Sequence, residues 1–384
     1  MRQGMIGSQP EFPRRDGEGR RQTRVWFNKS FSSIHGVLRQ LRQGWENEDS
    51  DLVILGSHSQ SGFGPFVECD IVETEPALSD GDYVEWCLDF CKRNAVDVFV
   101  PGRQRETIAD RVADFRSTGV RLVIAGDGDT LRLLEDKGRF LESLPPGVRA
   151  HRFERVQTWA ECEGAMGRLE ADGCRVCVKP AQGTFGIGFH VVTDRITPLR
   201  RLMSSEPYAI SKEELTDILK TADTFPEMLV MEYLDGPETS VDILARSGEV
   251  LALMARRKPV LGRVRISGSS HTEWVDEGPN QILDRQPEIE EMARRLVAHF
   301  RLGGLLNIQF RSRAERPERP CLLEINGRMS GGLPYVGLTG LNLPMLAVKV
   351  ALLKPGFPLP EIPEPRLPMR VGTRTEAFAV FNKP

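Results

Sequence analysis

The sequence of 384 residues has few cysteines, no long apolar run and no strong excess of charge. Its seven cysteines, an odd number spread along the chain, do not suit a disulfide framework, so we expect a reducing, cytoplasmic setting. No run approaches the roughly 18 to 20 apolar residues of a membrane-spanning helix, so no membrane partner is expected. The formal net charge of -3 likewise gives no reason to expect nucleic acid as a partner. These absences favour small-molecule chemistry.

The first 23 residues are polar, rich in Gly, Pro and Arg, and without hydrophobic periodicity. Such a stretch buries too little apolar surface to offset the entropy lost on ordering, so residues 1–23 are predicted to form a disordered leader. The chain as a whole is 40% hydrophobic and long enough for two or three domains.

After the leader, short apolar runs alternate with stretches of helical period, near 82–93 and 106–118. The runs expected as strands are RVWFN (24–28), DLVILG (51–56), FVECDIVE (66–73), VDVFVPG (96–102) and VRLVIAG (120–126). This alternation is typical of βαβ units and predicts a parallel sheet. Ligands of such sheets lie beyond the carboxyl ends of the strands, so the loops at 28–30, 56–64 and 102–106 are candidate site loops.

The rest of the chain has the pattern of an α+β region, with helices expected at 158–170, from Ser211, and at 287–302. The strands expected there are 175–180, 189–192, 228–234, 239–245, 249–257, 305–311 and 321–326. The charged, proline-bearing stretch 311–320 is expected to be a solvated hairpin tip.

The stretch CVKPAQGTFGIGFHVV (177–192) places Lys179 before a cluster of glycines. A P-loop has its lysine after the glycines, and both a P-loop and a dinucleotide-binding loop open a helix, so neither template fits. A lysine on one strand followed by a flexible loop would instead act as a lid over phosphate, because glycines let backbone N–H groups approach closely. A glycine-rich hairpin with a surface lysine is the alternative, and this stretch alone leaves both open.

Four further motifs accompany this loop in a fixed order: EDKGRF (135–140), MEYLDGPETSVD (231–242), NIQFR (307–311) and LLEINGRMSGG (322–332). Together the five resemble the ATP-grasp superfamily of carboxylate-activating ligases. The resemblance implies a parallel α/β domain at 24–127, a small lobe with a phosphate lid at 128–230, and a large lobe with a metal site at 231–384. It also implies ATP and Mg²⁺ as cofactors, with Mn²⁺ as an alternative. Members are often dimers, which leaves a homodimer open.

The resemblance also implies which residues hold the nucleotide. Lys137 and Lys179 would bind phosphate. The lid residues would be Gly183, Thr184, Phe185, Gly186 and Gly188. Adenine would be read by the carbonyl of Glu232 and the N–H of Leu234, and the ribose hydroxyls by Glu238. Because this readout uses the backbone, the Glu232 side chain is expected to face solvent.

A metal site can be argued from strand geometry. Alternate residues of a strand share a face, so Glu324 and Asn326 point the same way, and Gln309 on the preceding strand can face the same cavity. Oxygen ligands suit Mg²⁺. Many relatives, such as D-alanine:D-alanine ligase, have an acidic residue in place of Gln309, whereas carbamoyl phosphate synthetase uses the same Gln, Glu, Asn set. The lost charge would loosen one of two metals. A polar strand end with an Asn-Gly turn is the alternative.

The resemblance makes Arg328 the arginine that stabilises the transferring phosphoryl group, for which a planar guanidinium is suited. Ser330, Gly331 and Gly332 would form the loop that receives the substrate carboxylate, with a plain helix start as the alternative. The arginine-rich segment 256–274 offers further substrate contacts. There Arg263 and Arg265 are the candidates, and a solvated charged loop explains them equally well.

These features predict an ATP-dependent ligase that joins a small-molecule carboxylate to an amine through an acyl phosphate and releases ADP and phosphate. Lys179 and Arg328 would be its catalytic residues. A bicarbonate-activating carboxylase-type enzyme and a non-catalytic nucleotide sensor are the alternatives. The identity of the carboxylate and of the amine cannot be inferred from the sequence, and no residue stands out as the general base.

Overall fold

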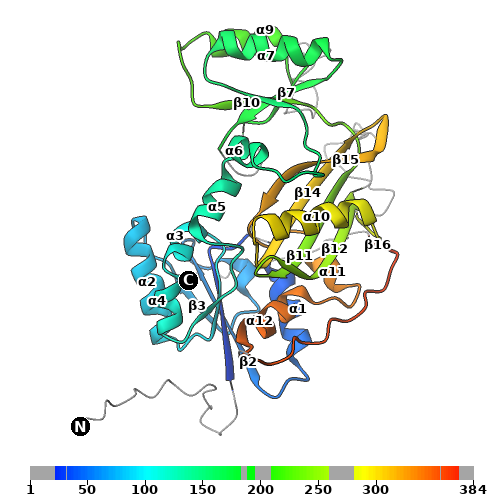
Figure 1. The fold of residues 1–384 in the computed structure, drawn as a ribbon. Helices are drawn as coiled ribbons and strands as arrows, with labels where there is room; N and C mark the ends of the chain where they lie inside the picture. Colours follow the sequence, from blue (N-terminus) through cyan, green and yellow to red (C-terminus); the bar gives the residue numbers. More distant parts are fainter. Residues whose placement is uncertain are drawn as a thin grey trace, which may run out of the picture.

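The computed structural model describes residues 22–31, 33–182, 188–194, 209–258, 281–354 and 356–371. Within these ranges the chain forms three β-sheets flanked by helices (Figure 1). None of the described helices is long and apolar enough to cross a membrane. Nothing in this fold tests the cytoplasmic setting or the homodimer, so both stay predictions.

The first sheet is parallel, with the strand order β3-β2-β1-β4-β5. Its strands are β1 (Gln22–Asn28), β2 (Asp51–His58), β3 (Ile71–Thr74), β4 (Val98–Val100) and β5 (Arg121–Leu122). Its helices are α1 (Ile34–Trp45), α2 (Asp80–Arg93), α3 (Arg105–Asp110) and α4 (Val112–Ser117). On one face, Trp26 of β1 stacks between Phe90 of α2 and Phe99 of β4. The predicted parallel α/β architecture is confirmed.

Three details differ from the sequence-based expectation. β1 begins at Gln22, so the last two residues assigned to the leader belong to the sheet. The run 66–73 is a strand only from Ile71, because Pro65 places a 3₁₀ helix, η1 (Gly64–Phe66), before it. The single helix expected at 106–118 is two short helices that meet at Arg111, whose backbone is not helical.

The second sheet has the order β6-β10-β7-β8-β9. Its strands are β6 (Phe153–Val156), β7 (Val176–Pro180), β8 (His190–Val192), β9 (Ala209–Ile210) and β10 (Met228–Glu232). Helices α7 (Trp159–Ala171) and α9 (Lys212–Leu219) cover its outer face (Figure 1). Val176 and Val178 pack against these helices, whereas Cys177 packs on the inner face. Since side chains alternate along a strand, Lys179 also faces inward.

The third sheet has the order β15-β14-β11-β12-β13-β16, and its neighbouring strands pair antiparallel. Its strands are β11 (Glu238–Arg246), β12 (Glu249–Lys258), β13 (Gln281–Leu283), β14 (Gly304–Arg313), β15 (Arg316–Asn326) and β16 (Met369–Val371). Helix α10 (Pro287–His299) packs on one face. On the other face lie α11 (Leu333–Gly337), α12 (Leu343–Leu352) and α1, which links this sheet to the first one.

The expected hairpin tip at 311–320 is mostly strand, because β14 and β15 continue into it. β15 is the edge of the sheet, so Pro317 and Pro320 can lie in it without removing a central ladder hydrogen bond. Two helices, α5 (Gly128–Glu135) and α6 (Lys137–Glu142), connect the first sheet to the second (Figure 1).

Candidate active site

A single cleft collects the nucleotide and metal residues expected from the sequence. Its lining includes Lys137, Lys179, Glu232, Leu234, Glu238, Gln309, Glu324, Asn326 and Arg328. These residues come from α6, from strands of the second and third sheets, and from the loops after β10 and β15. The cavity volume, about 450 Å³, falls in the range of small-molecule pockets, roughly 300–1,000 Å³.

Lys179 lies near both Lys137 and Glu324. Burial lowers the pKa of Lys179, the charge of Lys137 lowers it further, and the carboxylate of Glu324 opposes both. The Lys137 backbone N–H donates to the Ala181 carbonyl at 3.2 Å, which fixes the start of α6 beside the end of β7. The fold thus concentrates positive charge at the end of β7, close to one carboxylate.

The expected metal ligands face one another across two strands. Gln309 on β14 pairs directly with Glu324 on β15, and Asn326 Nδ2 donates to Glu324 Oε1 at 2.9 Å. Across the described ranges, no three His, Cys, Asp or Glu side chains are grouped to hold a metal ion. One carboxylate and two amides nevertheless fit Mg²⁺, because this ion accepts few protein ligands when phosphates and water supply the rest.

The hinge after β10 differs from expectation at one side chain. The side chain of Glu232 is buried, forms an ion pair with Arg313 of β14, and accepts a hydrogen bond from the Arg152 N–H at 3.4 Å. The expectation that it faces solvent is therefore wrong, because the end of β14 lies against this hinge. Leu234 is buried, and its N–H has no hydrogen-bond partner in the described part of the chain.

Arg256 contacts the loop that is expected to receive a carboxylate and stabilises it by a hydrogen bond. Arg256 Nη2 donates to Ser330 Oγ at 3.1 Å, and the Gly332 N–H donates to the same oxygen at 3.1 Å. A Cβ on Gly332 would lie 2.2 Å from Arg256 Nη1, so a larger residue would have to displace this guanidinium from its hydrogen bonds. Arg256 itself is 3% exposed and pairs with Asp242 of β11, Nε to Oδ2, at 2.6 Å. Helix α11 then starts at Leu333.

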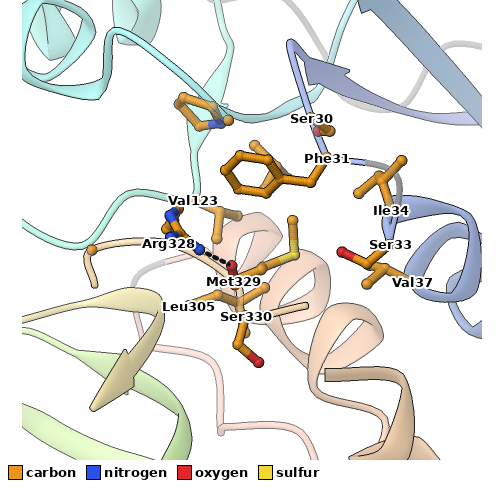
Figure 2. Close-up of a pocket in the computed structure, with 14 residues that line it drawn as sticks. Ser30, Phe31, Ser33, Ile34, Val37, Val123, Leu305, Arg328, Met329 and Ser330 are labelled. Carbon is orange, nitrogen blue, oxygen red and sulfur yellow. Dashed lines mark hydrogen bonds between the residues drawn. The ribbon is translucent and has the colours of Figure 1, made fainter. Parts of the chain in front are cut away.

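A second, smaller pocket, drawn in Figure 2, shares Arg328 with this cleft. Residues of the first sheet's loops, of α1, and of the loop after β15 line it. Arg328 lines both cavities, with its guanidinium 4.8 Å from the ring centroid of Phe31. Burial lowers the pKa of Arg328, the charge of Arg105 on α3 lowers it further, and Glu324 and Glu135 raise it. The larger cleft and the second pocket therefore meet at one half-buried arginine.

Comparisons with known proteins agree with this arrangement. The sequence profile of a family described as "ATP-grasp in the biosynthetic pathway with Ter operon" matches residues 224–377. No curated protein sequence matches the chain. Among solved structures, the L-amino acid ligase of Bacillus licheniformis is 15% identical with a TM-score of 0.56, over 86% of this chain and 74% of that one.

Two carboxylating enzymes are equally similar in fold. The biotin carboxylase of Campylobacter jejuni is 15% identical with a TM-score of 0.56, over 88% of this chain and 72% of that one. The N5-carboxyaminoimidazole synthetase of Staphylococcus aureus is 13% identical with a TM-score of 0.55, over 85% and 77%. The chain therefore has the fold of these enzymes, and its residues 224–377 match an ATP-grasp family.

Several expected ATP-grasp residues lie outside the described part of the chain. They are Gly183, Thr184, Phe185, Gly186, Arg263 and Arg265. Of the lid only Gly188 is described, with a φ of +75° that favours glycine. A Cβ there would lie 2.7 Å from Cδ of Pro180, at the other end of the loop.

The sequence also nominated three strand-end loops, and two of them reach the second pocket. Ser30 and Gly102 line the second pocket, whereas no residue of 56–64 lines either cavity. A hydrogen bond connects the loops 28–30 and 102–106, because Asn28 Oδ1 accepts from the Gly102 N–H at 2.6 Å. Arg105 then connects them to α5, with Nη2 donating to Glu135 at 2.8 Å.

Among the side chains that line the larger cleft, sequence reasoning did not single out Tyr233, Lys258 and Arg311. Lys258 pairs with Glu238, Nζ to Oε1, at 2.5 Å, and Arg311 Nε donates to the Gly236 carbonyl at 3.1 Å. Arg311 also lies 5.7 Å from the ring centroid of Tyr233. Tyr233 and Arg311 belong to the motifs already quoted, so proximity in sequence was an available signal. Lys258 belongs to the arginine-rich segment 256–274, but its position opposite Glu238 appears only in the strand register.

Proposed function

We propose that this protein is an ATP-dependent ligase that activates a carboxylate as an acyl phosphate and joins it to an amine. The observation that carries the proposal is the position of Arg328, which lines both the nucleotide cleft and the adjoining pocket. A phosphoryl group leaving ATP and an acceptor in the second pocket would meet at this guanidinium. The L-amino acid ligase among the structural neighbours supports carbon–nitrogen bond formation.

In the first step, a carboxylate oxygen attacks the γ-phosphorus, the bond to the β–γ bridging oxygen breaks, and ADP leaves with the electron pair. Lys179 and Lys137 would hold phosphate oxygens, and Arg328 would stabilise the transferring group. The main-chain groups of Glu232 and Leu234 would orient adenine, and Glu238 the ribose. Gln309, Glu324 and Asn326 would hold Mg²⁺, which supplies charge neutralisation between the phosphates when bound.

In the second step, the amine nitrogen attacks the acyl carbon and loses a proton, while the carbon–oxygen bond to phosphate breaks and phosphate leaves. Ser330, Gly331 and Gly332 would hold the carboxyl end of the substrate through hydroxyl and N–H groups. The rigid support from Arg256 favours this role, because a preorganised loop needs little rearrangement as charge develops. The lid around Gly188 would exclude water from the acyl phosphate.

A second candidate function is phosphorylation of bicarbonate. The amide of Gln309 opposite Glu324 favours it, since carbamoyl phosphate synthetase has the same ligand set, and two carboxylating enzymes are structural neighbours. The acceptor would then be bicarbonate, which needs no side-chain pocket.

Phosphate release measured with Mg²⁺-ATP tests these functions together. The assay uses mixtures of carboxylates with amines, bicarbonate alone, and ATP alone. Release that requires both a carboxylate and an amine, with ADP formed in equal amount, supports the ligase. Release with bicarbonate and no amine supports the second function. No release above that of a Glu324→Ala variant in any mixture would exclude both.

A further inference from the structure

The pocket beside Arg328 is lined mostly by apolar side chains (Figure 2). Its apolar wall consists of Phe31, Ile34, Val37, Val100, Val123, Leu305 and Met329. Hydroxyl groups of Ser30, Ser33 and Ser330 also reach the lining. Arg328 is the one charged side chain that lines it within the described residues. An occupant with a second charge would lose its hydration there without gaining a partner.

The wall is built from the protein's core and is therefore rigid. Ile34, Val37 and Val100 are at most 4% exposed and belong to the hydrophobic cluster that joins the first and third sheets. Gly102 also lines the pocket, and its backbone packs directly on another loop, because a Cβ there would lie 2.4 Å from the Asn28 carbonyl oxygen. Packed side chains of this kind do not move far to admit a larger group.

The pocket is also small. Its cavity volume is about 30 Å³, against about 450 Å³ for the nucleotide cleft. A cavity needs roughly 10–15 Å³ on this measure to hold one water molecule, so this one takes a few heavy atoms. An aromatic ring or a long chain would not fit without displacing the core.

We infer that this pocket selects a carboxylate substrate with a short, uncharged aliphatic side chain, whose carboxylate lies at Arg328 and whose side chain contacts Val37 and Ile34. The inference rests on the proposed ligase function and adds the substrate class. Arg328, held over Phe31, separates the pocket from the nucleotide cleft. The carboxylate would therefore face the γ-phosphate while the side chain is buried behind it.

The test measures kcat/KM for ATP-dependent phosphate release with glycine, L-alanine, L-valine, L-leucine, L-phenylalanine, L-aspartate and L-lysine, each supplying carboxylate and amine. Three proteins are compared: wild type, Val37→Ala, and Val25→Ala. Val25 is a matched control, because it is fully buried in the same cluster but does not line the pocket. A methylene in an apolar pocket changes discrimination by about 10- to 200-fold.

We expect wild type to prefer alanine or valine over phenylalanine, aspartate and lysine by at least about tenfold. Val37→Ala should raise the leucine-to-alanine ratio of kcat/KM by about tenfold or more, and Val25→Ala should leave it unchanged. A wild-type preference for a charged or aromatic substrate would overturn the inference. So would an equal shift in both variants.

Failure of the ligase proposal would appear differently, as no phosphate release with any member of the panel. Calorimetric titration of the same amino acids, with a non-hydrolysable ATP analogue and Mg²⁺ present, then decides the inference. Binding in the same order, with the same response to Val37→Ala, would support the pocket's selectivity. Absence of binding, or tighter binding of the charged members, would overturn it.

Discussion

Replacing Arg256 should destabilise the protein far more than replacing its neighbour Arg257. Both are on β12 and both form an ion pair, but Arg256 is 3% exposed and its partner Asp242 is 1% exposed. Arg257 is 39% exposed and pairs with Asp284, Nη2 to Oδ2, at 2.8 Å. The comparison therefore isolates the effect of burial on one kind of interaction.

The expected magnitudes follow from the partners left behind. Arg256→Met leaves Asp242 charged in the interior and removes hydrogen bonds to Gln281 and Ser330, which should cost about 3–5 kcal/mol. Arg257→Met breaks a half-exposed pair, which should cost about 0–1 kcal/mol. Adding Asp242→Leu to Arg256→Met should restore much of the loss, since the buried charge is then removed as well.

The assay is urea unfolding of the full chain, followed by tryptophan fluorescence and by circular dichroism. Coincidence of the two transitions is needed for comparing free energies of unfolding. Equal losses in Arg256→Met and Arg257→Met would refute the argument from burial. A double variant less stable than Arg256→Met alone would refute the account of Asp242 as the unpaired charge.

Three further predictions concern pH and glycine. Burial lowers the pKa of His151 to about 4 from 6.5, so the unfolded chain takes up the proton first. The contribution of neutral His151 to the free energy of unfolding is therefore fully present above pH 6.5, and it falls by about 1.4 kcal/mol per pH unit towards pH 4. The variant His151→Phe should flatten this slope, which urea unfolding at several pH values would measure. As pH rises through the lowered pKa of Lys179, its charge is lost and ATP affinity should fall. Lys179→Arg should keep its affinity to higher pH, and identical profiles in a nucleotide titration would contradict this. Gly332→Ala should raise the KM for the carboxylate more than Gly331→Ala, because its Cβ would lie 2.2 Å from Arg256 Nη1 and that of Gly331 3.3 Å from Ser33 Oγ.

Much of the architecture could be predicted because it depends on local periodicity. The two strands expected on either side of the glycine stretch are reproduced by β7 and β8, which pair antiparallel, and the βαβ pattern is reproduced by the first sheet. Several candidate site residues line one cleft, because alternation along strands fixes which side chains share a face. Gln309 opposite Glu324 is such a case.

What the sequence could not predict depends on contacts between segments far apart in the chain. The burial of Glu232 requires Arg313, which is 81 positions away. The support of Ser330 by Arg256 crosses 74 positions, and the pocket wall combines α1 with loops of two sheets. No local pattern marks these pairs, since each residue type is also common on solvated surfaces.

The central claim is that Lys179 and Glu324 act together on the phosphates of ATP. The most direct test measures ATP turnover of Lys179→Ala and Glu324→Ala with the most active carboxylate and amine pair, and checks folding by circular dichroism. Glu318→Ala is the matched control, because Glu318 lies exposed on the same strand, β15. We predict a loss of at least about 100-fold in both site variants, with folding retained and the control unaffected. Turnover in both site variants equal to that of Glu318→Ala would contradict the account.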